Sequence, residues 1–204
     1  MAVADKSDKV TAREARRLQT RERLLGAATA EFKRTGMAQA DVGAIVAAAG
    51  VAHGTFFFHF PTKEHVLLEL ERREEERIAK QFGKFLVKHH DLSDILAEAA
   101  RLVIDLERRL GDPLFTEFLA LHFSPTRPPA ESGEHHPLIV LIAERIEVAR
   151  ERGEIDEDVV AMNSAVFFLL GLYALLITTR DWPIRPELVA DYLTRTSRSL
   201  RALR

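Results

Sequence analysis

Hydrophobic positions recur at helical spacing in almost every segment of this 204-residue chain. The first apolar stripes are formed by Leu24, Leu25, Ala28 and Phe32, and then by Val42, Ile45 and Val46. The second stripe lies among alanines, which favour helix. Strand-like alternation of apolar and polar residues is absent. The pattern therefore predicts an all-α protein.

Glycines, prolines and polar stretches divide this pattern into separate helices. The predicted helices cover residues 12–34, 41–49, 52–60, 62–88, 91–110, 113–123, 137–152, 158–179 and 186–203. Residues 1–11 are polar and are predicted to form a flexible arm. Residues 124–136 contain three prolines and a glycine before Pro137 and are predicted to form a loop.

The segment from Asp41 to Lys63 predicts a helix-turn-helix. Asp41 is placed to cap one helix, and Gly50 supplies the left-handed backbone of a sharp turn. Pro61 ends the short helix that follows. In a helix-turn-helix the second helix enters the DNA major groove. The arrangement alone also occurs in many all-α cores.

The flanking residues make this segment specific. Arg21-x-x-Leu24-Leu25-x-Ala27-Ala28-x-x-x-Phe32 precedes it, Gly50-Val51-x-x-Gly54-Thr55-Phe56-Phe57-x-His59-Phe60 lies within it, and Lys63-Glu64-x-x-Leu67-Leu68 ends it. Across residues 21–70, about a quarter of the chain, the sequence resembles the DNA-binding domain of the tetracycline-repressor (TetR) family. The resemblance implies a three-helix DNA-binding domain over residues 12–61. It also implies a larger helical domain over residues 62–204 that binds a ligand and dimerises.

The resemblance also assigns residues to the DNA. Those that match its DNA-contacting positions are His53, Gly54, Thr55, Phe57, Phe58, His59, Lys63, Gly43 and Arg21. Lys63 would meet a phosphate. Phe57 stands where tyrosine is usual, so a hydroxyl contact to phosphate is lost, and Gly43 stands where arginine or another polar residue is frequent. Ala52 replaces a serine that often caps the recognition helix.

Charge changes this picture only locally. The net charge is −2, so DNA affinity would have to come from basic clusters. Residues 1–23 carry seven basic and four acidic side chains, a local excess of three. Beside a DNA-binding motif, we favour phosphate contact over an ordinary solvated helix face.

The C-terminal region predicts a homodimer and a pocket. Residues 161–179 are apolar nearly all round, which is typical of a helix buried on every side, here by a second subunit. The family resemblance implies that the helices over residues 137–152 and 158–179 build the dimer, and the predicted interface consists of Leu138, Ile142, Ile146, Val166 and Leu170. An aromatic interior suggests a site for a small hydrophobic effector. Its predicted lining is Phe82, Phe85, Leu86, Phe115, Phe118, Leu119, His122, Phe123, Asn163, Phe167 and Tyr173.

Other functional classes have little support. The chain has no cysteine, and its eight histidines do not show the zinc-helix spacing. No nucleophile elbow, phosphate loop or dinucleotide motif occurs, so no enzyme activity, cofactor or metal is expected. The apolar run of residues 165–177 is too short to cross a bilayer, and no signal peptide is evident. We expect a cytoplasmic protein without a membrane partner.

These observations predict a ligand-responsive transcriptional regulator that binds double-stranded operator DNA. The simplest form is a repressor that a small hydrophobic effector releases from a palindrome. A DNA binder controlled by a protein partner, or by no ligand, is the first alternative. A helical enzyme is the second.

Overall fold

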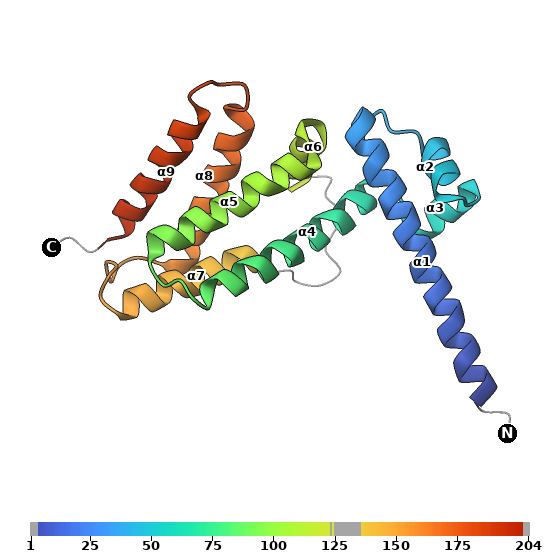
Figure 1. Cartoon of the computed structure of the whole chain (residues 1–204), viewed down its shortest axis with the longest axis horizontal. Coiled ribbons are helices and arrows are strands. Elements are labelled where there is room, and N and C mark those ends of the chain that lie inside the picture. Colours follow the sequence, from blue (N-terminus) through green and yellow to red (C-terminus); the bar gives the residue numbers. More distant parts are fainter. Residues whose placement is uncertain (1–3, 123, 125–135, 202–204) are drawn as a thin grey trace. The chain divides into compact units, whose positions relative to one another are not determined.

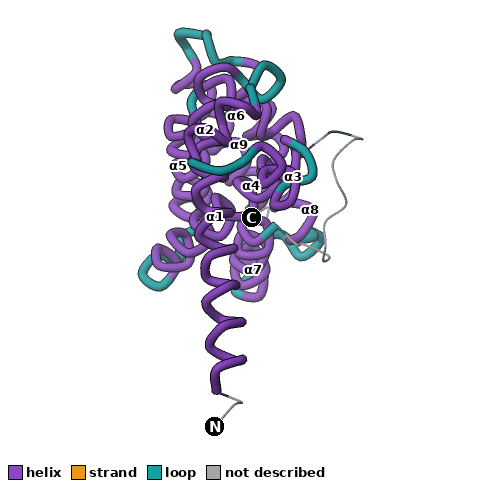
Figure 2. Tube along the Cα trace, turned by 90° about the vertical axis from the view of Figure 1, so that its right-hand side faces the viewer, coloured by secondary structure: helices purple, strands orange, loops and turns teal. Residues whose placement is uncertain are grey.

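The computed structural model describes residues 4–122, 124 and 136–201, without the side chains of residues 4–10 and 122. Within these residues the chain forms nine helices and no strand (Figures 1 and 2), which confirms the all-α prediction. The helices are α1 (Ala4–Thr35), α2 (Val42–Ala49), α3 (His53–His59), α4 (Lys63–Leu86), α5 (Leu92–Leu110), α6 (Asp112–His122), α7 (Pro137–Glu151), α8 (Ala161–Thr178) and α9 (Arg185–Leu200).

The chain divides into two compact units. The first holds Met1–Glu71 and Leu110–Pro128, and the second holds Arg72–Arg109 and Pro129–Arg204. The division falls inside α4 rather than before residue 62, and α6 groups with the N-terminal helices. The N-terminus also differs from expectation, because α1 is helical from Ala4, where the sequence predicted a flexible arm.

The first unit is built on the apolar stripe of α1. Leu24, Leu25, Ala28 and Phe32 are all buried, and α1 packs along both α2 and α6. Gly36 ends α1 with a positive φ of 77°, and its N–H donates to the Phe32 carbonyl at 2.9 Å. A residue with a Cβ would be strained in that left-handed conformation. The turn between α1 and α2 is therefore fixed at this point.

In the second unit α7 packs along α8, and this corrects part of the dimer prediction. Leu138, Ile142 and Ile146 follow one another at every fourth position, and all three are buried within a single chain. They cannot face a partner subunit. The apolar stripe of α7 serves the monomer core because α8 offers an equally apolar face of its own.

Helix α9 docks on α8 through Tyr192. The Tyr192 hydroxyl donates to the Phe168 carbonyl at 2.7 Å, and the two rings stack with centroids 6.0 Å apart. This approach requires Gly171, since a Cβ there would lie 2.5 Å from the Tyr192 hydroxyl. Arg185 adds an ion pair to Glu107 at 2.7 Å, which ties α9 to α5. The second unit is thus held together across four helices.

Helix α8 leaves one apolar face uncovered. Asn163, Phe167, Leu170 and Ala174 are exposed at successive turns, and Phe167 is 69% exposed. By length and composition alone, α8 could cross a membrane, with a mean hydropathy of 1.9 over 18 residues, and this contradicts the expectation that no apolar run is long enough. A core helix of a soluble protein has the same composition. Only 28% of α8 is buried in the single chain, and an exposed apolar face of this kind is typical of an interaction surface.

Candidate nucleic-acid interface

Helices α2 and α3 form the predicted helix-turn-helix. The Asp41 carboxylate caps α2 by accepting the Gly43 N–H at 2.8 Å. Gly50 closes the helix with φ 63° and ψ 43°, and the next residue returns its N–H to the Val46 carbonyl. The chain bends by 95° between the two helices. This angle lies within the range of a helix-turn-helix.

The recognition helix α3 has one buried and one exposed aromatic face. Phe56, together with Phe60 just beyond the helix, is fully buried and anchors α3 to the core. Phe58 is 74% exposed, and Phe57 and His53 lie on the surface with ring centroids 5.6 Å apart. Large exposed aromatic side chains are costly in water unless a partner covers them.

The remaining predicted residues of α3 also lie in this short helix. Gly54 is exposed, and Thr55 and His59 are half-buried. Burial lowers the pKa of His59, and the nearby charges of Arg21 and Arg17 lower it further. A lowered pKa keeps this imidazole neutral at pH 7, so it would act on DNA as a hydrogen-bonding group rather than as a cation. All six predicted residues of the helix are therefore brought together.

Arg21 positions α3, which differs from the predicted DNA contact. Its guanidinium donates to the His59 carbonyl at 2.6 Å and pairs with Glu69 at 3.2 Å. The same group lies 4.2 Å from the centroid of the Phe60 ring. These contacts tie α1 to the end of α3 and to α4. The guanidinium that the sequence predicted to contact DNA is therefore already paired within the protein.

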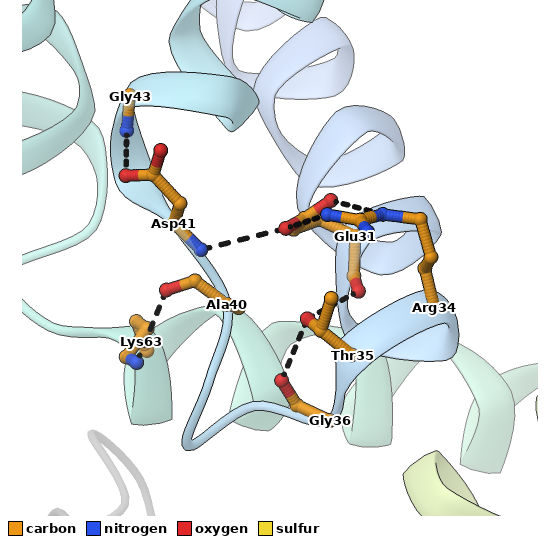
Figure 3. A network of polar contacts seen from close by, with 8 residues as sticks. All are labelled: Glu31, Arg34, Thr35, Gly36, Ala40, Asp41, Gly43 and Lys63. Atoms are coloured by element: carbon orange, nitrogen blue, oxygen red, sulfur yellow. Dashed lines mark hydrogen bonds and ion pairs between the residues drawn. The ribbon is translucent and has the colours of Figure 1, made fainter.

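Gly43 lies in the first turn of α2, inside a polar network that sequence reasoning missed (Figure 3). Glu31 Oε1 accepts a hydrogen bond from the Arg34 guanidinium at 2.7 Å, and the same oxygen lies 3.5 Å from the backbone nitrogen of Asp41. The Arg34 hydrogen bonds are the main reason that the pKa of Glu31 is lowered. A Cβ on Gly43 would lie 3.2 Å from the Asp41 carboxylate. Glycine therefore fits the cap, but it brings no side chain to the DNA.

Lys63 does not have the predicted free ammonium. Its Nζ donates to the carbonyl oxygens of Met37, Ala38 and Ala40 at 2.6, 3.0 and 3.4 Å, the last drawn in Figure 3. An ammonium group has three N–H donors, and here all three are used. Lys63 therefore holds the α1–α2 turn instead of presenting its charge to phosphate.

Glu117 of α6 holds the same turn from another side. Its carboxylate accepts the Met37 N–H at 2.6 Å. Eighty residues separate the pair, and no local pattern in the sequence indicates the contact. The α1–α2 turn is thus fixed by α4 and by α6 at once.

The residues predicted to bind a ligand divide between the two units. In the first, Phe115, Phe118 and Leu119 are buried on α6, whereas Phe123 and the side chain of His122 lie outside the described residues. In the second, Phe82 and Leu86 are buried and Tyr173 is half-buried.

Three other predicted ligand residues are not in the interior. Asn163 and Phe167 lie on the exposed face of α8, because its opposite face supplies the core. Phe85 stacks on His89 at 3.9 Å beside an open groove of about 310 Å³ that is lined largely by charged residues of α5. The prediction that these three line an apolar interior is corrected accordingly.

Comparison with known proteins identifies the helix-turn-helix. The family described as bacterial regulatory proteins, tetR family, matches residues 24–70, which span the core of α1, the helix-turn-helix and the start of α4. Residues 24–70 carry the DNA-binding segment of the tetR family. The matched family consists of regulatory proteins, and the function of this chain is transcriptional regulation.

Relatives extend the likeness beyond the matched segment. The HTH-type transcriptional regulator UidR of Escherichia coli K12 is 25% identical over 148 residues, which cover 71% of this chain and 74% of UidR. The TetR-family repressor FadR of Thermus thermophilus, solved with lauroyl-CoA, has a TM-score of 0.69 at 23% identity and covers 90% of this chain and 96% of its own. RolR, solved with resorcinol, has a TM-score of 0.68 at 18% identity, with 92% and 90% covered. The two structures show that the TetR fold extends over both units.

The observed role of Lys63 leads to a prediction. Lys63→Ala should lower the free energy of unfolding by about 1 kcal/mol, because three turn carbonyls lose a charged donor. DNA affinity should fall as a consequence. Lys84→Ala, which changes an exposed lysine of the same helix, should alter neither quantity. Urea unfolding measures stability and DNA titration measures affinity, so together they distinguish support of the turn from direct contact with DNA. If Lys63→Ala lost affinity while its stability stayed unchanged, Lys63 would contact phosphate after all.

Proposed function

We propose that this regulator is a cytoplasmic homodimeric repressor that binds a palindromic operator through α3 and leaves it when a small hydrophobic effector binds. The observation that carries the DNA-binding part is the recognition helix. It presents Phe58 and His53 to solvent while Phe56 and Phe60 fix it to the core. An exposed phenyl ring on a helix that enters the major groove can contact a thymine methyl group.

A dimer explains the uncovered face of α8. Phe167 and Leu170 are one turn apart and exposed, and Val166 beside them is half-buried. A second copy of the same face would cover this surface by two-fold symmetry. It would also place two recognition helices on one operator, about 34–36 Å apart. Of the interface residues predicted from the sequence, the proposed interface keeps Val166 and Leu170. Phe167 takes the place of the three predicted residues of α7.

The effector is proposed from the core composition and from relatives. Each unit has large buried aromatic residues, Phe115 and Phe118 on α6 in the first and Phe82 on α4 in the second. T. thermophilus FadR was solved with lauroyl-CoA and RolR with resorcinol, which are an acyl chain carrier and a phenol. We infer a ligand of similar apolar or aromatic character. Control by a protein partner remains the alternative, and the effector experiment below distinguishes it.

The DNA-binding proposal predicts separable effects on α3. Phe58→Ala should reduce operator affinity by about 1–3 kcal/mol, roughly 5- to 150-fold, while the free energy of unfolding stays within about 0.5 kcal/mol. His53→Ala should change the preferred base at its own position. Val87→Ala is the matched control, because Val87 is 75% exposed and lies outside the recognition helix. Selection from random-sequence duplexes supplies the operator, and unchanged affinity in both α3 variants would refute the assignment.

The dimer proposal predicts that Phe167→Glu gives a folded monomer. A carboxylate on the self-packing face would be buried without a partner and cost several kcal/mol of association energy. Val87→Glu places the same charge on a comparably exposed position and should leave the dimer intact. Light scattering at micromolar concentration measures the mass. A wild-type monomer under these conditions would rule out the dimer.

The effector proposal predicts that an apolar compound stabilises the protein and releases DNA together. The panel consists of lauroyl-CoA, shorter acyl-CoAs and simple phenols. A coupling of about 1–3 kcal/mol would lower operator affinity roughly 5- to 150-fold, because the ligand must prefer the conformation that does not bind DNA. Phe58→Ala should still be stabilised by the compound, since its change lies in the DNA site. Stabilisation without release would show a binding site but no switch, and no response to any compound would favour the protein-partner alternative.

A further inference from the structure

Helix α1 is much longer than its packing requires. Its 32 residues span about 48 Å, but among the residues whose side chains are described the first buried one is Leu24. Residues 11–19 are all exposed. Figures 1 and 2 show the N-terminal half extending past α2 and α3 without a neighbouring helix of its own unit. A helical stretch of this kind gains nothing from packing within the unit, so its sequence is free to serve an external partner.

The exposed half carries a stripe of arginines. Arg13, Arg16 and Arg17 lie within an arc of about 100° when successive residues are about 100° apart. The acidic residues of the same stretch, Glu14 and Glu22, are turned from Arg13 by about 100° and 180°. None of the three arginines forms an ion pair with any described residue. Arg34, at the other end of the same helix, is instead paired with Glu31 at 2.7 Å.

This stripe is continuous with the recognition helix. Arg21 donates to the carbonyl of His59, the last residue of α3, at 2.6 Å. Arg17 lies one helical turn before Arg21, and Arg13 lies one turn earlier, so the stripe extends about 12 Å beyond that contact. Burial, followed by the charges of Arg21 and Arg17, lowers the pKa of His59, so Arg17 lies close enough to the end of α3 to act on it. A distance of about 12 Å corresponds to three or four base pairs along a duplex.

We propose that Arg13, Arg16 and Arg17 form a second DNA-binding surface, which contacts the phosphates flanking the base pairs that α3 reads. The proposal rests on the proposed operator binding and extends it outward along the duplex. Its basis is charge complementarity, because three unpaired guanidinium groups on one helix face match a strand of phosphates. Because α3 is the helix proposed to occupy the major groove, arginines of α1 beyond it would reach backbone oxygens rather than base edges. The contact is therefore independent of sequence.

The expected size follows from counterion release. Each phosphate contact adds about 0.9 to the slope of log affinity against log salt concentration. Removing two contacts should lower the slope by about 1.8, and at 0.15 M salt this corresponds to roughly 30-fold weaker binding. The sequence preference should not change.

The test measures the affinities of the wild-type protein and of the double variant Arg13→Ala/Arg17→Ala for two duplexes. One duplex holds only the operator core selected by the full-length protein from random-sequence DNA, and the other extends it by about six base pairs on each side. The wild-type protein should bind the longer duplex more tightly, and Arg13→Ala/Arg17→Ala should lose this gain while binding the core duplex as the wild type does. Alanine preserves the helix, so the variant removes charge without unfolding α1.

The control removes the same charge elsewhere. Arg108→Ala/Arg195→Ala changes two arginines whose side chains are 75% and 77% exposed, and it should keep the gain from flanking base pairs. A wild-type protein that binds both duplexes equally would overturn the flank contact and leave the operator proposal standing. Equal losses on both duplexes would also overturn it, since the arginines would then act on folding or on α3. If the wild type selects no duplex at all, the operator proposal itself fails. If the arginine stripe binds anionic vesicles and its removal has no effect on DNA binding, the stripe serves another partner and the proposal is overturned.

Discussion

Beyond the buried Phe56 and Phe60, the orientation of the recognition helix depends on the three-way contact of Arg21. Helix α3 has only seven residues and no side-chain cap at its N-terminus, so its own hydrogen bonds cannot fix its orientation. Arg21 reaches α3 from α1. Its guanidinium packs on the face of the Phe60 ring and donates a hydrogen bond to the carbonyl of His59, the last residue of the helix. Glu69 of α4 balances the charge. Because one side chain joins three helices, a shift of α1 or α4 would be transmitted directly to α3.

The α1–α2 turn shows the same use of charge for positioning. Lys63 donates to three of its carbonyls, and Glu117 accepts one of its N–H groups. Both groups are satisfied within the first unit, which favours a turn with one conformation. The N–H donors of Lys63 and Arg21 are therefore occupied within the unit, although the carbonyl partners of Lys63 are neutral and leave its charge uncompensated. The arginines of the exposed half of α1 form no ion pair with any described residue, so both their donors and their charge are open to phosphate.

The sequence predicts local features well and long-range contacts poorly. The turn at Gly50 and the Asp41 cap follow from residue type and spacing within one or two turns. The roles of Lys63 and Arg21 do not, because a lysine at a phosphate position and a lysine that binds backbone carbonyls look alike in a sequence. Glu117 is harder still. Its partner is a backbone N–H, which every residue except proline has.

Helix α8 shows a different limit, where the periodic signal itself disappears. Both of its faces are apolar, so hydropathy alone cannot tell the face that packs on α7 from the face that a partner would cover. The family resemblance placed the apolar stripe of α7 in the dimer interface, although that stripe builds the monomer core. Packing in three dimensions resolves the two faces, because Gly171 must lie against Tyr192 and this fixes the rotation of the helix. Once α9 is docked there, Phe167 and Leu170 lie on the opposite, exposed face of α8, which is the face that the proposed dimer would bury.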